Sequence, residues 1–417
     1  MRRPLILSAF IVLAVHALAA PAYRLVGVHV KGSKHYPEAD IIRASGLKLG
    51  AATTEPMLEE VANRMAESGA FAQVTFQYRT GPGGMTVDFE VQDSPEFLPC
   101  RFDNFVWLPA ADLLAELRTR VPFFDGAVST AGKMTARVSD ALRQLLAERK
   151  IEASVDYLLH QRKLGAPIDA VVFVVQGASI PVRDIAVTGA SPFAEPLLQD
   201  AIKPLVGGNY HASVVESFVA NNLVPIYLRR GYLRATFGEP QARFADGAVS
   251  VTVPVVEGLE YKAGDVRWSG NAALSAAELS GKLHLARGQT ADAVQLSADL
   301  EKLTELYGSR GYLRAAIEPV PSYDDATRTV AYDFRVSEGE QYHMGRIEVS
   351  GIDGDAAGRV LAAWRMREGD PYDATYSLRF LRENSTKIPV SLSRMRLKTS
   401  TQINPDRSVN VLLIFAP

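Results

Sequence analysis

Cysteine is almost absent from this sequence. Its 417 residues include a single cysteine, Cys100, so the chain cannot form an intramolecular disulfide. A lone cysteine of this kind is typically a small buried hydrophobic residue. The fold must therefore be stable without a disulfide framework.

Strong net charge and long apolar runs are also missing. The formal net charge is only −2, which argues against a nucleic-acid partner, since such proteins carry basic surfaces. Beyond the first 22 residues, no stretch approaches the ~20 apolar residues that a membrane-spanning helix needs. The composition favours a globular protein that does not bind nucleic acid.

Recognisable catalytic and cofactor motifs are missing too. The seven histidines are scattered, and none stands in a metal-binding spacing such as H-E-x-x-H. In the stretch GAVSTAGKMT, residues 126–135, five residues separate the glycines where a phosphate loop has about four, and Met134 replaces its serine or threonine. The GPGG stretch at residues 81–84 indicates a hairpin turn. We expect no enzyme activity, no cofactor, no metal site and no small-molecule substrate.

The N-terminal segment has the pattern of a secretory signal peptide over residues 1–22. Two arginines precede an apolar run from Leu5 to Leu18, which small residues follow. This run is shorter than a membrane-spanning helix, although a retained N-terminal anchor is the alternative. We expect cleavage near Ala19 or Ala22 and export to the periplasm.

What the sequence does contain is an internal repeat. The phrase R-G-Y-L-R-A occurs twice, with its glycines at Gly231 and Gly311. Upstream of these copies, a glycine that ends an apolar, strand-like stretch recurs every 81 residues, at Gly189, Gly270 and Gly351. A fixed period of this kind is the signature of tandem copies of one supersecondary unit.

Five copies account for the sequence after the signal peptide. We place them at residues 23–93, 94–178, 179–258, 259–339 and 340–417, the second and the fifth being diverged. In the fourth copy, alternation around Trp268 predicts a strand, Ser275 the N-cap of a short helix, and three leucines with Tyr307 a longer amphipathic helix. Two strands follow. The predicted fold class is α+β: an elongated array of five β-α-α-β-β units, each a three-stranded sheet covered by two helices.

The glycine of R-G-Y is predicted to end the long helix of each copy. Glycine enters the left-handed region without a Cβ penalty, so it suits a helix that turns directly into a strand. The residues four and eight positions before each cap should then be buried. This rule assigns the structural caps Gly69, Gly231, Gly311 and Asn384, and it leaves Lys150 as an unfavourable cap in the second copy.

The residues around these caps carry further expectations. The tyrosine after the glycine should pack onto the helix as the chain enters the next strand. Arg234 and Arg314, two residues further on, should face solvent. Pro225 lies inside the long helix of the third copy and should kink it, because proline removes a backbone donor.

Together these features resemble the POTRA domain. The resemblance rests on strand-helix-helix-strand-strand units behind a signal peptide, a first strand ending in V-x-G, and a helix closing on R-G-Y. POTRA domains are the periplasmic modules of the BamA family, which assembles outer-membrane β-barrel proteins, and of two-partner secretion transporters. The resemblance implies a non-catalytic module associated with the outer membrane through its partners. We expect no barrel in this chain, because Val409 to Pro417 indicates the last strand of the fifth copy.

The resemblance also implies where a partner would bind. An exposed strand edge recruits an extended peptide through main-chain hydrogen bonds, and in this family the second strand of a unit is the usual edge. Such strands are expected to begin at Gln73, Leu233, Leu313 and Pro389. The predicted protein-binding residues are Leu233, Arg234, Ala235, Thr236, Phe237, Leu313, Arg314, Ala315, Ala316 and Ile317.

The expected partners are unfolded outer-membrane proteins, or a partner barrel or lipoprotein, with no nucleic acid. Two other functions stay open at this point. The array could be a rigid structural adaptor that links a separately encoded barrel or lipoprotein to the periplasm. It could also be a cell-division POTRA protein, which would need a retained N-terminal anchor.

Overall fold

The computed structural model describes residues 21–161, 163, 165–384 and 396–416. Nearly all of the predicted signal peptide, and the start of the edge strand expected from Pro389, therefore lie outside the described residues. The chain divides into two compact units. The first extends to Asp184 and includes Gly207–Val214 and Ala242–Ser250; the second holds Ile185–Val206, Val215–Gln241 and the chain from Val251 onward.

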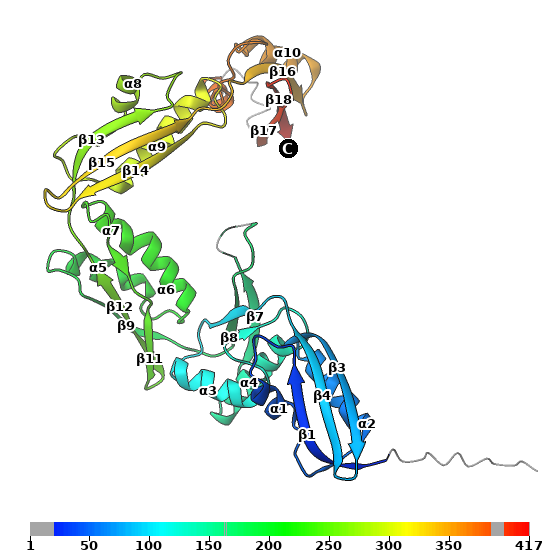
Figure 1. Ribbon diagram of the computed structural model, residues 1–417. Helices are drawn as coiled ribbons and strands as arrows, with labels where there is room; N and C mark the ends of the chain where they lie inside the picture. The colour runs from blue at the N-terminus through cyan, green and yellow to red at the C-terminus, as the bar shows by residue number, and fades with distance from the viewer. Residues whose placement is uncertain (1–20, 162, 164, 385–395, 417) are drawn as a thin grey trace, which may run out of the picture. The chain divides into compact units, whose positions relative to one another are not determined.

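Small sheets with helices beside them make up the described residues (Figure 1), so the predicted α+β class is confirmed. The first sheet has the strand order β2-β1-β4-β3, four strands where three were predicted, because the two-residue strand β2 pairs with β1. Its elements are β1 (Tyr23–Lys31), α1 (Glu38–Ser45), β2 (Ala52–Thr53), α2 (Glu55–Glu67), β3 (Phe71–Gly81) and β4 (Gly84–Asp93). Gly81 pairs with Gly84, so the GPGG stretch is a hairpin turn as predicted.

The second sheet repeats this plan with the order β6-β5-β8-β7. Its elements are β5 (Leu98–Phe102), α3 (Ala110–Arg120), β6 (Ala127–Val128), α4 (Met134–Glu148), β7 (Ser154–His160) and β8 (Ala170–Gln176). In both sheets the first long strand runs parallel to the last, and the strand before the last pairs antiparallel with it.

The third sheet has the order β10-β12-β11, with β9 also paired to β12. Its strands are β9 (Val182–Thr188), β10 (Thr236–Phe237), β11 (Gln241–Ala245) and β12 (Ala248–Val256). Its helical segments are α5 (Glu195–Ile202), a 3-10 turn (Lys203–Leu205), α6 (Ala212–Phe218), a π-helical turn (Val219–Leu223) and α7 (Val224–Leu228). The long helix is thus interrupted just before Pro225, where a kink was predicted.

The fourth and fifth sheets have the orders β13-β15-β14 and β16-β18-β17. The fourth contains β13 (Lys262–Ser269), α8 (Ala276–Ser280), α9 (Ala293–Ser309), β14 (Ala316–Asp324) and β15 (Thr329–Ser337). The fifth contains β16 (His343–Ser350), α10 (Gly354–Ala363), α11 (Tyr376–Glu383), β17 (Arg396–Ile403) and β18 (Ser408–Ala416). Ser275 caps α8 by accepting a hydrogen bond from the Glu278 N–H, as predicted.

The glycine after the first strand has a steric cause. Gly270 has a φ of +79°, and a Cβ atom there would lie 2.1 Å from the Val336 carbonyl oxygen in the last strand of the same sheet. Gly351 repeats this, with φ +84° and 1.8 Å to the Phe415 carbonyl oxygen. The close approach of two backbones excludes every side chain. This constraint explains the first landmark of the 81-residue period.

The long helices bury the face that the cap rule predicted. The buried members are Val61, Met65, Leu142, Leu146, Leu223, Tyr227, Leu303, Tyr307 and Phe380. Tyr376 is partly buried and packs against the core of the fifth sheet. The tyrosines after the glycines pack on the helices, since Tyr312 meets the Tyr307 ring edge-on with 6.1 Å between centroids. The core of each sheet therefore lies between its strands and this helix face.

Candidate functional site

Three of the four predicted helix caps are left-handed, as expected. Their φ angles are +84° at Gly69, +80° at Gly231 and +90° at Gly311. After Gly311, the Tyr312 N–H donates to the Tyr307 carbonyl oxygen at 3.0 Å, and the Gly311 N–H donates to the Gly308 carbonyl oxygen at 3.2 Å. This pair of bonds is the Schellman motif, and it recurs at Gly231.

The prediction for Asn384 is wrong in its conformation. Its φ is −108°, outside the left-handed region. The Asn384 backbone N–H and side-chain amide both donate to the Phe380 carbonyl oxygen, at 3.0 and 2.9 Å. Because the Phe380 carbonyl oxygen accepts both of these hydrogen bonds, it is satisfied without a left-handed turn. Lys150, in contrast, does adopt a φ of +60°.

The carbonyl groups of two R-G-Y glycines hold the segment that precedes the next sheet. The Gly311 carbonyl oxygen accepts a hydrogen bond from the Tyr342 N–H at 2.8 Å, and the Gly231 carbonyl oxygen accepts one from the Tyr261 N–H at the same distance. A Cβ atom on Gly311 would lie 2.5 Å from the Tyr342 carbonyl oxygen. We call these two contacts the glycine joints. Each leaves no room for a side chain at the glycine.

The ten predicted edge residues divide between a turn and a strand. Thr236 and Phe237 form β10, while Ala316 and Ile317 begin β14. The residues before them, Leu233, Arg234, Ala235, Leu313, Arg314 and Ala315, lie in turns instead. Each turn is closed by a 3.2 Å hydrogen bond from the alanine N–H to the carbonyl oxygen of the R-G-Y tyrosine. Their placement in an edge strand is therefore wrong, because the turn delays the strand by three residues.

Side chains of this turn contact the next sheet. Leu233 packs against the core cluster around Tyr261, and Leu313 packs against the cluster around Tyr342. Both leucines therefore reinforce the glycine joints.

Arg234 is exposed, as predicted, but it also makes contacts that the sequence did not indicate. Its guanidinium lies over the rings of Tyr261 and Tyr323, 5.2 and 5.0 Å from their centroids. It also donates hydrogen bonds to Asp325 and to the Tyr261 hydroxyl. The hydrogen bond from Arg234 holds the pKa of the Asp325 carboxyl below its ordinary value. Arg314 makes a looser version of this contact, 5.9 Å from the Tyr342 ring centroid. Sequence reasoning missed both roles, because the aromatic partners lie far along the chain.

The outer edge of β14 is poorly suited to accept another strand. β14 lies at the end of its sheet and pairs with β15 over nine residues. Pro319 and Pro321 stand inside β14. Proline lacks an N–H group and in an edge strand normally occupies a position that faces away from the neighbour. Two donors of the free edge are therefore missing.

β3 presents a more continuous edge. It is the terminal strand of the first sheet, and its eleven residues contain no proline. Val74, Phe76 and Tyr78 pack against the core on one face, while the alternate residues are exposed. The predicted edge at Gln73 is thus confirmed as the terminal strand of a sheet. Its free side offers backbone donors and acceptors along its length.

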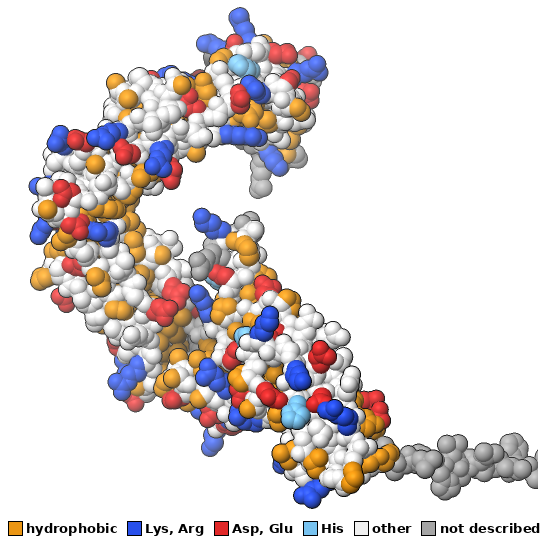
Figure 2. Space-filling model, in the orientation of Figure 1, with side chains coloured by type: hydrophobic (Ala, Val, Ile, Leu, Met, Phe, Trp, Pro, Cys, Tyr) orange, Lys and Arg blue, Asp and Glu red, His pale blue; other side chains and the backbone are white. Residues whose placement is uncertain are grey.

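β7 is a second open edge, which sequence reasoning missed. It is the terminal strand of the second sheet and pairs with β8 over seven residues. Its side chains include three consecutive exposed hydrophobic residues: Tyr157 (48% exposed), Leu158 (64%) and Leu159 (50%). Figure 2 shows hydrophobic side chains around the β7–β8 hairpin. The sequence could have indicated it, because in each copy the strand that follows the cap of the long helix is the expected edge, and β7 is the strand that follows Lys150.

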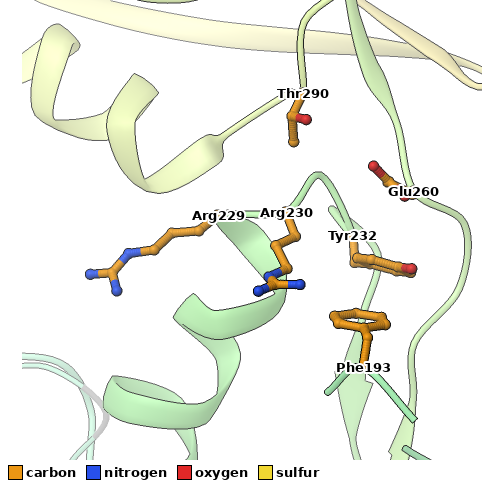
Figure 3. Close-up of a pocket in the computed structure, with 6 residues that line it drawn as sticks. All are labelled: Phe193, Arg229, Arg230, Tyr232, Glu260 and Thr290. Atoms are coloured by element: carbon orange, nitrogen blue, oxygen red, sulfur yellow. The ribbon is translucent and has the colours of Figure 1, made fainter. Parts of the chain in front are cut away.

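A shallow pocket of about 320 Å³ lies beside the Gly231 joint (Figure 3). It is lined by Phe193, Arg229, Arg230, Tyr232, Glu260 and Thr290. The rings of Phe193 and Tyr232 stack with 5.4 Å between centroids. The Arg230 guanidinium lies 5.0 Å from the Phe193 ring centroid. The pocket therefore combines an aromatic floor with two guanidinium groups.

The part of the chain that the structure describes offers little for metal or phosphate chemistry. It contains no group of three or more histidine, cysteine, aspartate or glutamate side chains that could hold a metal ion. Lys133, in the rejected phosphate-loop stretch, pairs with the Glu67 carboxylate at 2.7 Å. Over the same described residues, a helix with the length and apolar character of a membrane span is not found.

Known proteins are similar to parts of this chain. Residues 261–339 match the family model POTRA, described as surface antigen variable number repeat. A protein of Treponema pallidum (strain Nichols), provisionally described as an outer membrane protein assembly factor, is 26% identical over 238 residues. That match covers 52% of this chain, and the chain spans only 28% of the length of the Treponema protein.

Solved structures of POTRA domains are also similar. The structure of POTRA domains 3–5 of Haemophilus influenzae BamA is 22% identical, covers 57% of this chain and 96% of its own, and gives a TM-score of 0.44. The isolated POTRA4 domain of the same protein is 30% identical, covers 20% of this chain and 95% of its own, and gives a TM-score of 0.19. The family match at residues 261–339 agrees with the strand-helix-helix-strand-strand order of that segment, so the chain contains a POTRA match and is similar to a protein described as an outer membrane protein assembly factor.

Proposed function

We propose that this chain is a non-catalytic periplasmic module in outer-membrane protein assembly, and that it binds extended partner segments along the open edges of its sheets. The POTRA match and the description of the Treponema relative support the general role. The open edges of β3 and β7 support the mode of binding. A partner strand would pair with their free N–H and C=O groups, which demands little of the partner's sequence.

The exposed hydrophobic residues of β7 favour it over the other edge strands as the binding site. β7 has no proline and exposes Tyr157 and Leu159 on one face and Leu158 on the other. Natural edge strands are normally protected by charges, proline or bulges. β14 shows such protection in Pro319 and Pro321. Asp156 is the one acidic residue in β7. A hydrophobic edge without proline is a surface that a partner strand can cover, so β7 is the strongest candidate and β3 the next.

Amide hydrogen exchange of the mature protein tests this proposal. The probe is a synthetic peptide that copies a membrane strand of an outer-membrane protein. We expect slower exchange in β7 and β3 when the peptide is present, and no change in β14. Slower exchange confined to helices would contradict edge pairing and would favour the alternative of a rigid adaptor that docks a folded partner.

A matched pair of variants sharpens the test. Leu158→Lys places a charge on the β7 edge, which opposes strand addition, and should weaken peptide binding about tenfold or more. Leu378→Lys changes an equally exposed leucine, 68% against 64%, on helix α11, and should leave binding unchanged. Equal affinities of the two variants would overturn the assignment to β7.

A further inference from the structure

The two R-G-Y copies differ in how their arginine is satisfied. In the fourth sheet's copy, the Arg310 guanidinium pairs with the Glu278 carboxylate on α8 at 2.6 Å. One 81-residue period earlier, the counterpart of Glu278 is Leu197, which is 39% exposed. Arg230 therefore lacks the carboxylate that Arg310 has, and no ion pair of Arg230 occurs within the described part of the chain.

The third copy also has a second arginine next to the first, at the position where the fourth copy has a serine. The residue before Arg310 is Ser309, whose hydroxyl donates to the Leu306 carbonyl oxygen within its own helix. The residue before Arg230 is Arg229, which is exposed and, like Arg230, forms no ion pair in the described ranges. Where the fourth copy has one arginine in an ion pair, the third copy has two adjacent arginines with no ion pair in the described ranges. Both line the pocket beside the Gly231 joint.

The pocket also fixes how one guanidinium is presented. Arg230 lies over the face of Phe193, which stacks on Tyr232 (Figure 3). Stacking on an aromatic ring orients the planar guanidinium while its N–H groups stay available, and such a group binds a carboxylate through two parallel hydrogen bonds. Glu260 contributes one negative charge to the lining, so two arginines leave a positive excess.

We infer that this pocket binds a carboxylate-bearing segment of a partner protein. The carboxylate contacts Arg229 and Arg230, and an adjacent apolar side chain covers the stack of Phe193 and Tyr232. The pocket of about 320 Å³ is shallow, which suits one or two side chains of a polypeptide better than an enclosed small ligand. This inference rests on the proposed role as a protein-binding module and adds the chemistry of the partner.

The test measures binding of short labelled peptides to the mature protein by fluorescence anisotropy. One peptide, blocked at both ends, carries the sequence Gly-Ser-Glu-Glu-Phe-Ser-Gly. A second replaces both glutamates by glutamine, and a third is the glutamine peptide with a free C-terminal carboxylate. We expect the glutamate peptide to bind roughly tenfold more tightly than its blocked glutamine counterpart at low salt, with the difference shrinking as salt is raised. If the third peptide binds more tightly than the blocked glutamine peptide, a chain terminus is also an acceptable source of the carboxylate.

Variants assign the preference to the pocket. The double substitution Arg229→Gln with Arg230→Gln should abolish the preference for glutamate, while Arg310→Gln, in the paired copy, should keep it. Both arginines are exposed, so the double variant should melt at the same temperature as the unaltered protein. Equal binding of the glutamate and blocked glutamine peptides, or a preference that survives the double substitution, would overturn the inference. Leu158→Lys should not affect this preference, so failure here is separable from failure of edge binding at β7.

Discussion

Gly311 meets two separate constraints. Its φ of +90° lies in the left-handed region, which glycine enters without strain. Lys150 shows that this conformation alone does not require glycine, because it holds a φ of +60° at the same point of its own copy. What excludes a side chain at Gly311 is the Tyr342 carbonyl oxygen beside it. The sequence predicted the first constraint, whereas the second depends on a residue thirty-one positions away and could not be foreseen.

Alanine substitutions separate these two constraints. Gly288 also has a left-handed φ of +80°, but a Cβ atom there would meet nothing within 4 Å. Gly288→Ala should lower the free energy of unfolding by about 1 kcal/mol through backbone strain alone. Gly311→Ala should lower it by at least ~1 kcal/mol more, since the glycine joint must also shift. Chemical denaturation of both variants measures the difference, and equal losses would show that the joint does not restrict Gly311.

At the scale of the elements, helices were easier to predict than strands. The spacing of Leu296, Leu303 and Tyr307 predicts α9, because the buried face of a helix is formed by residues of one continuous segment. The strands β2 and β6 have only two residues each, and the pairing of a distant strand defines them. The start of β14 was misplaced because the turn from Tyr312 to Ala315 contains no glycine, proline, asparagine or aspartate that would indicate a turn. Likewise, the open edge of β7 follows from the strand order, which periodicity does not encode.

The loop between α8 and α9 depends on a buried carboxylate. Asp299 in α9 is fully buried and accepts hydrogen bonds from the His284 backbone N–H at 2.7 Å and from the Gln295 side chain at 2.9 Å. Its carboxylate also lies 2.8 Å from the His284 Nδ1 atom. Burial raises the pKa of Asp299, but the hydrogen bonds outweigh it and hold this pKa below the ordinary value. The ionised carboxylate thus fastens the loop to the helix.

This arrangement predicts a dependence on pH. Because the pKa of Asp299 is lower in the folded state, its stabilisation is complete above the unfolded pKa of about 4 and is lost as the pH falls through the folded pKa. Asp299→Asn should cost about 1–3 kcal/mol at pH 7, and this cost should shrink below pH ~4. Denaturation at several pH values measures it. Asp265→Asn, at an exposed ion pair with Arg287, serves as the control and should change stability by less than ~1 kcal/mol. A cost for Asp299→Asn that is independent of pH would contradict this role.

At the scale of the whole molecule, the 81-residue period predicts five copies. The strands of each described sheet fall within one predicted copy, and the family match at residues 261–339 nearly coincides with the fourth, 259–339. The period is visible in the sequence because Gly189, Gly270 and Gly351 meet the same steric constraint, a carbonyl oxygen of the last strand in their sheet. The contacts of Arg234 could not be read, since Tyr323 and Asp325 belong to the following copy.

The boundaries predict which fragments fold. A fragment of residues 259–339 should be folded by itself and should unfold cooperatively, because it contains one complete sheet with both its helices. A fragment of equal length shifted by half a period, residues 219–299, should not, because it separates β13 from β15, its parallel partner. Circular dichroism with thermal unfolding compares the two. Cooperative unfolding of the shifted fragment would show that the copies are not the units of folding.

The glycine joints have a consequence for how such a chain changes its length. The hydrogen bond at each joint runs between a main-chain carbonyl oxygen of Gly231 or Gly311 and a main-chain N–H of Tyr261 or Tyr342. These groups are the same whichever copy supplies them. A duplication or deletion of one whole period therefore brings the same two partners together at the new seam. We therefore expect such a change in copy number to keep the main-chain hydrogen bond of the joint, while the side-chain contacts of Leu233, Leu313 and Arg234 would depend on the copy that follows.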